Sequence, residues 1–527
     1  MIQIYDTTLR DGTQAEDIAF TVEDKLRVAE KLDWLGVHYI EGGWPGANPK
    51  DSEFFERAGG ELKLKTAELV AFGSTRKASS TVETDEILGS LLDAGTKTLC
   101  IFGKTWDLHV TRALGISLAD NLKLVFESVA WLKKKKRTVI YDAEHFFDGF
   151  KANKKYALET IRAAARAGAD RIVLCDTNGG SLPQDVEKIV RIVRKNLRVP
   201  LGIHCHDDTG LGVANSLAAV RGGVTQVQGT LNGIGERCGN ANLVSVMADL
   251  ELKMGYRCVG PARLARLREV SLFVDEMANR AADTHQPYVG DSAFAHKGGI
   301  HVSAILKEAR TYEHVDPKKV GNRQRVLVSD LSGASTIAHK AREFGVDLSG
   351  NNPRARELLT KLKEMENRGY QFEGAEASFE ILVKKTLGEY KPHFVLHDFR
   401  VTDTISLDHV EGEATSEAVV HLAVDKREEK SSAKGVGPVH ALDRALRQAL
   451  ERFYPRLAEM KLVDYKVRVL KGVGTASVVR VLIECGDSQG KWGTVGVSEN
   501  IIHASYQALV DAIDYKLMKE GFPLIIS

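Results

Sequence analysis

The chain of 527 residues lacks an excess of charge of either sign. It has 72 lysines and arginines against 71 aspartates and glutamates, which gives a formal net charge of +1 at pH 7. Nucleic-acid-binding and membrane-surface proteins usually carry a basic excess or a basic face. The basic run at 133–137 follows an amphipathic stretch, where the C-terminal end of a helix favours cations. The charge pattern therefore predicts neither a nucleic-acid nor a membrane partner.

The sequence also lacks paired cysteines and long apolar runs. Its six cysteines form no CxxC pair, and several lie in apolar, strand-like stretches where a thiol behaves as a small hydrophobic group. No apolar run approaches the ~18 residues that indicate a membrane-spanning helix, and the N-terminus shows no secretory signal pattern. These absences predict a cytoplasmic protein in a reducing environment.

The first half of the chain alternates regularly between strand-like and helix-like segments. Many of the helical segments end in the glycine that is expected just after a helix. Eight such units in about 250 residues match the size of a (β/α)8 TIM barrel. A doubly wound open sheet is the alternative, but no GxGxxG turn follows the first strand. The expected strands are 2–6, 37–43, 69–74, 98–103, 138–144, 171–176, 201–207 and 225–231.

Two further regions follow the predicted barrel. The first is mostly helical and polar, and the second turns to strands and contains an internal repeat. Strand-like 418–425 and helix-like 435–450 have counterparts in 477–485 and 496–513, which predicts two strand–strand–helix units in a small pseudo-symmetric α+β domain. We therefore expect a barrel, a helical linker region and a C-terminal domain over residues 1–265, 266–390 and 391–527.

Polar residues gather where the predicted barrel strands end, which is the rim where barrels of this type carry their chemistry. An apolar barrel would not keep so many charged and amide groups at one rim without a functional reason. In chain order they are Arg10, Asp11, Gln14, Glu41, Asp142, Glu144, Asp176, Thr177, His204, His206, Glu236 and Asn240.

The stretch GIHCHDDTGLG at 202–212 places two histidines two residues apart on a predicted strand. Their side chains should share one face, while Cys205 should face the helix layer. Two hydrogen-bonded structural histidines would explain an isolated HxH motif. At the rim, beside Asp11, the pair is better explained as metal ligands, and nitrogen and oxygen donors without thiolate indicate Mg, Mn, Zn or a similar divalent ion.

Three motifs carry a resemblance to a known family: DTTLRDGTQ (6–14), GIHCHDDTGLG (202–212) and NGIGERCGNANL (232–243). They resemble those of the isopropylmalate, homocitrate and citramalate synthases, which condense acetyl-CoA with 2-oxo acids on a metal-dependent barrel. FAHKGGIHVSAILK (294–307) resembles the linker motif of that family, and the C-terminal repeat resembles its regulatory and dimerisation domain. IEGGWPGANPKD (40–51) resembles the citramalate synthase branch. That branch is an acyltransferase that condenses acetyl-CoA with pyruvate to give (R)-citramalate in an early step of isoleucine biosynthesis.

The resemblance also implies roles for single residues. Arg10 would stabilise the developing alkoxide, and Glu144 would serve proton transfer or orient water near the acetyl group. His301 and, less firmly, Tyr312 would reach the site from the partner subunit of a homodimer. The base that deprotonates acetyl-CoA is not identified. The implied metal ligands are Asp11, His204, His206 and the weaker Asn240, and the implied substrate-binding residues are Arg10, Gln14, Glu41 and Thr177.

Several alternatives remain open. A sibling synthase that accepts 2-oxoisovalerate in the leucine pathway is the nearest alternative, and the size of the pocket decides between the two. A lyase or aldolase on the same barrel would also need a divalent metal, but such enzymes do not require the C-terminal repeat. A biotin-dependent transcarboxylase would need an MKM sequence, which does not occur. A non-catalytic amino-acid sensor is the alternative from another class. We expect isoleucine to be the feedback inhibitor, bound near the predicted helix starts at 435–438 and 496–500, where backbone N–H groups suit a carboxylate.

Overall fold

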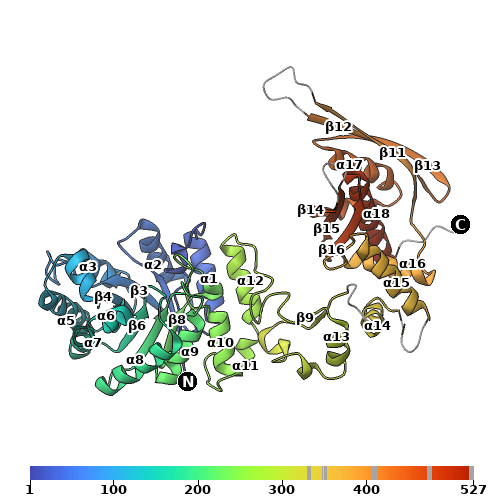
Figure 1. Ribbon diagram of the computed structural model, residues 1–527. Coiled ribbons are helices and arrows are strands. Elements are labelled where there is room, and N and C mark those ends of the chain that lie inside the picture. The colour runs from blue at the N-terminus through green and yellow to red at the C-terminus, as the bar shows by residue number, and fades with distance from the viewer. Residues whose placement is uncertain (329–333, 347, 349–352, 406–413, 472–476, 522–527) are drawn as a thin grey trace. The chain divides into compact units, whose positions relative to one another are not determined.

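The computed structural model describes residues 1–328, 334–346, 348, 353–405, 414–471 and 477–521. The chain divides into two units, one of residues 1–294 with 315–324 and one of residues 295–314 with 325–527 (Figure 1). The second unit contains most of the predicted linker together with the C-terminal domain. The three-part division at 265 and 390 therefore stays a prediction.

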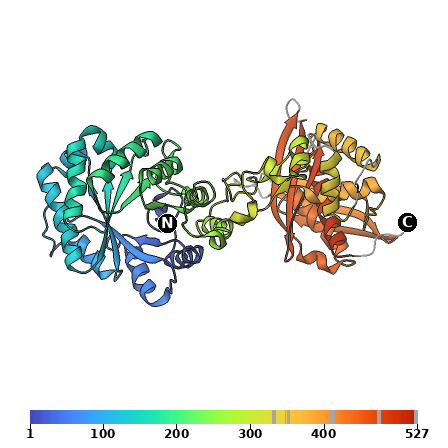
Figure 2. The same cartoon turned by 90° about the horizontal axis from the view of Figure 1, so that it is seen from below.

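The first unit is built on a closed barrel of eight parallel strands, as the sequence predicts. Each strand pairs with its neighbour along the chain, and β1 closes the barrel against β8, with Gln3 opposite Gln226 and Asp6 opposite Gly229. Helices surround the strands (Figure 2). The strands are β1 (Gln3–Asp6), β2 (Tyr39–Gly43), β3 (Glu68–Ser74), β4 (Thr98–Lys104), β5 (Thr138–Glu144), β6 (Arg171–Asp176), β7 (Leu201–Cys205) and β8 (Gln226–Gly229).

Local signals begin and end the helices between these strands. In α1 (Val22–Leu35), Thr21 and Asp24 form a reciprocal capping box, and Gly36 ends the helix with a left-handed φ of 92°. The other α-helices of this unit are α2 (Pro49–Glu61), α3 (Glu86–Asp93), α4 (Asp107–His109), α5 (Leu118–Lys134), α6 (Phe146–Ala152), α7 (Lys154–Arg166), α8 (Pro183–Asn196), α9 (Gly212–Gly222), α10 (Leu243–Leu252), α11 (Pro261–Leu264) and α12 (Leu267–Met277).

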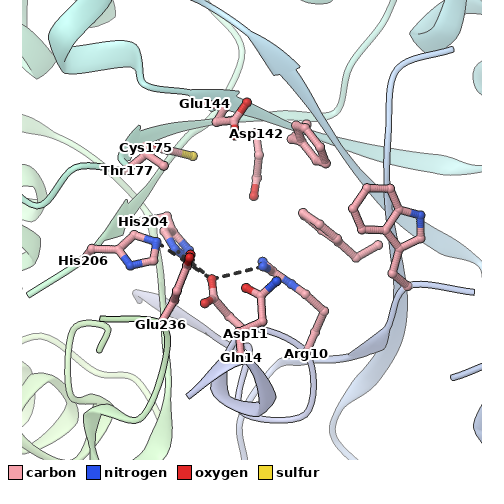
Figure 3. A pocket seen from close by; sticks show the side chains of 13 residues that line it. Arg10, Asp11, Gln14, Asp142, Glu144, Cys175, Thr177, His204, His206 and Glu236 are labelled. Carbon is pink, nitrogen blue, oxygen red and sulfur yellow. Dashed lines mark hydrogen bonds and ion pairs between the residues drawn. The ribbon is translucent and has the colours of Figure 1, made fainter. Parts of the chain in front are cut away.

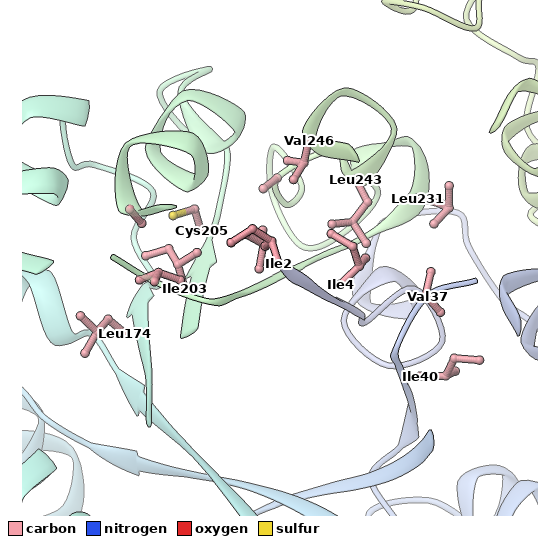
Figure 4. Close-up of a cluster of buried hydrophobic side chains, with 14 of the residues drawn as sticks. Ile2, Ile4, Val37, Ile40, Leu174, Ile203, Cys205, Leu231, Leu243 and Val246 are labelled. Atoms are coloured by element: carbon pink, nitrogen blue, oxygen red, sulfur yellow. The ribbon is translucent and has the colours of Figure 1, made fainter. Parts of the chain in front are cut away.

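Two separate apolar clusters fill the barrel unit. The larger cluster lies between strands and helices and contains Ile4, Ile203 and Val246 together with Cys205 (Figure 4). The smaller cluster consists of alternate strand residues inside the barrel, among them Phe72 and Cys175. Cys205 therefore faces the helix layer, as predicted, and the interior cluster forms the floor beneath the polar rim.

The second unit begins with short elements, and three longer helices follow them. The short elements are β9 (Ala295–His296), α13 (Gly299–Ile305) and β10 (Arg325–Val326), and the longer helices are α14 (Ala334–Glu343), α15 (Pro353–Asn367) and α16 (Glu376–Leu387). An apolar cluster that includes Leu358, Phe379 and Val495 joins α15 and α16 to the second C-terminal sheet. The expectation of a mostly helical region before the C-terminal repeat is confirmed.

Two copies of a three-stranded antiparallel sheet followed by a helix complete this unit. The predicted repeat is present, but each copy has three strands rather than two, and the strand-like runs at 418–425 and 477–485 correspond to the middle strand of each sheet. The copies are β11 (Val395–Ile405), β12 (Ala414–Val424), β13 (Arg427–Gly435) and α17 (Pro438–Leu450), then β14 (Lys461–Lys471), β15 (Val478–Asp487), β16 (Gly490–Ser498) and α18 (Ile501–Lys519). Within the described residues, no helix is both long enough and apolar enough to cross a membrane.

Candidate active site

Asp11, His204 and His206 meet at the C-terminal rim of the barrel (Figure 3). Asp11 lies in the loop after β1, while His204 in β7 and His206 just after it point to the same side. The Asp11 Oδ2 atom is 3.4 Å from His204 Nε2 and 4.0 Å from His206 Nε2. The three residues are buried, and their potential ligand atoms all lie within 4.8 Å of one another. The same-face arrangement predicted for the HxH pair is therefore confirmed.

Three polar atoms at this cluster have no hydrogen-bond partner among the described residues: Asp11 Oδ1, His206 Nδ1 and Asn240 Oδ1. A backbone bridge holds Asn240 beside His206. Gly235, at a φ of 156°, makes room for this arrangement, because a Cβ there would lie 2.2 Å from Asn240 Nδ2. Burying unpaired carboxylate and amide oxygens is unfavourable unless a ligand satisfies them. One carboxylate, two imidazoles and an amide oxygen fit a divalent cation.

A hydrogen-bonded chain orients His204. Its Nδ1 lies 3.0 Å from Gln228 Oε1, and Gln228 Nε2 donates to Asp142 Oδ1 at 3.2 Å. Because the Gln228 oxygen accepts from Nδ1–H, Nε2 is the ring nitrogen that faces Asp11, and it can bind a metal once its own proton has left. Burial raises the pKa of Asp142 to about 6, with a further contribution from the charge of Glu41.

Burial and neighbouring charges set the protonation states of the predicted ligands. Burial, followed by the positive charge of His204, lowers the pKa of His206 to about 4, so this ring is neutral at pH 7. Burial alone would raise the pKa of Asp11, but Arg10 and the two histidines hold it well below its usual range. A neutral imidazole and an ionised carboxylate are the forms that bind metals.

Three neighbours hold Arg10 above the barrel interior. Its Nε donates to Glu41 Oε1 at 2.6 Å, its Nη1 donates to Asp11 Oδ2 at 3.1 Å, and its guanidinium lies 3.8 Å from the centre of the Phe72 ring. Glu41 is fully buried, and its second oxygen accepts from the Tyr5 hydroxyl. The predicted contact between Glu41 and substrate stays untested, but its position behind Arg10 favours a positioning role.

The pocket around these groups has a volume of about 190 Å³ and one aromatic wall. Trp44 packs edge-on against Phe72 and Phe102, with ring centres 5.8 and 5.6 Å apart. Phe72 and Phe102 are not among the residues predicted from the sequence, although two-residue alternation in β3 and β4 places each of them on the same face as an interior neighbour. The other lining residues are Arg10, Asp11, Gln14, Asp142, Glu144, Cys175, Thr177, His204, His206 and Glu236.

Two further predicted residues line the pocket opposite Arg10 (Figure 3). Thr177 Oγ1 accepts from the backbone N–H of His145 at 2.8 Å, so its own hydroxyl hydrogen remains available to a substrate oxygen. Glu144 Oε2 forms an ion pair with Lys104 Nζ at 2.5 Å. Cys175, at the end of β6, also lines the pocket. Burial raises the pKa of Cys175 well above its usual value, so it supplies no thiolate nucleophile.

His301 and Tyr312 belong to the second unit. Their rings lie 4.2 Å apart at an angle of 30°, and both side chains are exposed. The structure therefore brings these two predicted residues together. Their action on substrate stays a prediction.

Known families match nearly the whole chain. Residues 1–274 match the HMGL-like family, residues 288–370 the homocitrate synthase post-HMGL domain-like family, and residues 373–517 the LeuA allosteric (dimerisation) domain. The chain is 58% identical to the (R)-citramalate synthase of Geobacter sulfurreducens and 51% identical to that of Aquifex aeolicus, over 98% of each chain in both cases. A probable 2-isopropylmalate synthase of Methanopyrus kandleri is 32% identical over 97% of this chain and 98% of its own. The chain therefore belongs to the (R)-citramalate synthase family.

Proposed function

We propose that the barrel site condenses the acetyl group of acetyl-CoA with pyruvate, giving (R)-citramalate and free CoA after hydrolysis of the thioester. One geometric observation supports this proposal. The buried Asp11–His204–His206 cluster, which contains polar atoms without a hydrogen-bond partner among the described residues, lies in the same pocket as a fixed arginine and an aromatic wall. The relatives named (R)-citramalate synthase support the reaction itself.

Asp11, His204, His206 and, more weakly, Asn240 would hold the divalent metal ion. When bound there, such an ion acts as a Lewis acid toward the carbonyl of a 2-oxo acid. Arg10 faces the same space, and its guanidinium is the group that stabilises negative charge on the developing alkoxide oxygen. Because Glu41 and Asp11 fix this guanidinium before substrate arrives, little reorganisation is needed during the reaction.

The remaining residues position the two substrates. The Thr177 hydroxyl, whose oxygen already accepts from a backbone N–H, donates to the carboxylate of the acceptor. Gln14 lies at the exposed edge of the pocket and supplies an amide for substrate binding. Glu144, held by Lys104, serves proton transfer near the acetyl group or orients the hydrolytic water. His301, beside Tyr312, acts on the acetyl-CoA half of the reaction from the partner subunit.

The aromatic wall favours pyruvate over a branched acceptor. Trp44, Phe72 and Phe102 pack against one another, so additional methyl groups on the acceptor would require these rings to move. A well-packed pocket excludes a larger substrate more sharply than an open pocket excludes a smaller one. This wall is the specific observation that separates the proposal from 2-isopropylmalate synthesis, in which 2-oxoisovalerate is the acceptor.

The C-terminal domain supports two finer proposals, a homodimer and feedback inhibition by isoleucine. The two sheet–helix copies form a pseudo-symmetric unit, and the matched family model is described as allosteric and dimerising. At the second predicted helix start, the Asn500 side chain already accepts from the N–H groups of Ile502 and His503. The first start, at Gly437, has no side-chain cap, so we place the isoleucine carboxylate there.

All six cysteines are free, which supports a reducing cytoplasm.

Removal and return of metal tests the proposed reaction. The purified chain is dialysed against a chelator and assayed for CoA release and for citramalate, with the two enantiomers separated by chiral chromatography. We expect neither product without metal, and equal amounts of CoA and (R)-citramalate after Mg²⁺ or Mn²⁺ is added. Full activity in the metal-free chain, or CoA release without citramalate, would contradict the proposal.

A further inference from the structure

A second group of side chains that could hold a metal ion lies on the outer face of the first C-terminal sheet, in the unit that does not contain the barrel. His397 lies on β11, His421 on β12 and Glu428 on β13, so each of the three strands contributes one residue. Their potential ligand atoms lie within 4.8 Å of one another. The opposite face of this sheet packs against α17 through residues such as Val420 and Leu422.

A β-bulge in β11 produces this arrangement. Leu396 pairs with Leu422 and Asp398 pairs with His421, which leaves His397 as an extra residue with no partner on β12. In a regular strand, His397 and Asp398 would project from opposite faces. The bulge turns both of them toward His421, and the two imidazole rings lie 5.0 Å apart.

The distances match the spacing of ligands around one metal ion. Glu428 Oε2 lies 2.8 Å from His421 Nε2 and 3.3 Å from His397 Nε2. Two donors that each lie ~2.1 Å from a metal are separated by roughly 3.0 Å in octahedral geometry and 3.4 Å in tetrahedral geometry. A single ion can therefore contact all three atoms with small movements of exposed side chains.

A second carboxylate fixes the orientation of the central histidine. Asp398 Oδ2 lies 3.3 Å from His421 Nδ1, on the side of the ring away from Glu428. A carboxylate that accepts from one ring nitrogen while the other binds metal is a recurring feature of histidine–metal sites.

We propose that His397, His421 and Glu428 form a second metal site, which takes a borderline divalent ion such as Zn²⁺, Co²⁺ or Ni²⁺. Two imidazoles and one carboxylate favour these ions over Mg²⁺, which prefers oxygen ligands. Water completes the coordination, because the site is partly exposed. A bound ion connects all three strands and so stabilises the sheet against opening at its β11 edge.

Metal titration of a chain whose barrel site has been removed tests this proposal. In the His204→Ala/His206→Ala background, competition with a chromophoric chelator should show one Zn²⁺ or Co²⁺ bound per chain and no comparable binding of Mg²⁺. Adding His421→Ala should weaken this binding by more than ~100-fold, since it removes a direct ligand. Adding Asp398→Asn, which keeps all three ligands, should weaken it by about 10- to 100-fold.

His440→Ala is the matched control, because it removes another exposed histidine of the same domain. It should leave the metal affinity unchanged. The Glu428→Gln variant retains the side-chain shape and should also lose affinity, which covers the case in which an alanine variant fails to fold. Absence of a bound Zn²⁺ or Co²⁺ in the barrel-site variant would overturn the proposal. Binding that is equally tight in His421→Ala, Glu428→Gln and His440→Ala would overturn it as well.

Discussion

Replacement of Glu41 by glutamine separates a positioning role from direct contact with substrate. Glu41 is fully buried, and its two oxygens accept from Arg10 Nε at 2.6 Å and from the Tyr5 hydroxyl. In E41Q the amide oxygen can still accept from Arg10, but the amide nitrogen can only donate to Tyr5. Arg10 then retains Asp11 as its one directly bonded carboxylate among the described residues.

The size of the effect follows from the loss of a charged acceptor. A hydrogen bond to a charged group contributes about 1.5–3 kcal/mol, and the free energy of unfolding should fall by a similar amount. If Arg10 stabilises the alkoxide only in the correct orientation, kcat should fall ~10- to 100-fold, at about 1.4 kcal/mol per factor of ten. The KM for pyruvate and the affinity for metal should change little, because Glu41 is neither a ligand nor part of the pocket wall.

Steady-state CoA release over a range of pyruvate concentrations, together with urea denaturation, measures these quantities. Glu68→Gln is the control, since Glu68 is a carboxylate at the start of the neighbouring strand β3, where it accepts from Thr98. It should leave kcat unchanged. An E41Q variant with a raised KM for pyruvate and an unchanged kcat would refute the positioning role and would place Glu41 in contact with the acceptor.

Four further predictions concern the metal, the acceptor, the linker and the effector. His206→Ala should weaken metal binding by more than ~100-fold and Asn240→Ala by less, because a neutral amide is the weaker donor; calorimetry that shows equal losses would contradict this. Trp44→Ala should raise kcat/KM for 2-oxoisovalerate relative to that for pyruvate by roughly 10-fold, which is the size of the discrimination that a hydrophobic pocket provides. An unchanged ratio would show that the aromatic wall does not select the acceptor. His301→Ala should lower kcat far more than the affinity for pyruvate, and heterodimers with an otherwise inactive subunit should recover activity; verified heterodimers without recovery would favour a histidine that acts within one chain. Deletion of residues 391–527 should leave a barrel that no longer responds to isoleucine, and calorimetry that detects no isoleucine binding to the intact chain would leave this domain a role in dimerisation alone.

The meeting of Asp11, His204 and His206 could be predicted because it depends on local regularities. His204 and His206 share a face through simple strand alternation, and the barrel brings Asp11 to the same rim. The relation between Arg10 and Glu41 could not be predicted in the same way. Arg10 follows β1 and Glu41 lies within β2, but which side chain lies above the other depends on the register between these strands, where Asp6 pairs with Ile40.

The aromatic wall and the β-bulge show two further limits of sequence reasoning. Both faces of a barrel strand are apolar, so alternation groups Phe72 with Val70 without showing which face lies inside. The bulge at His397 adds one residue to a strand, and nothing in the adjacent letters HD indicates that both side chains emerge on one face. Packing and pairing across strands decide such features.

The ratio of kcat/KM for pyruvate to that for 2-oxoisovalerate shows which 2-oxo acid the barrel site accepts. It is measured by CoA release from acetyl-CoA, with one preparation of the full chain and a saturating divalent metal. The small, aromatic-walled pocket predicts that pyruvate is preferred by ~10- to 200-fold, which is the range that hydrophobic exclusion of added methyl groups provides. An equal or higher kcat/KM with 2-oxoisovalerate would contradict the account and would assign the barrel to isopropylmalate synthesis.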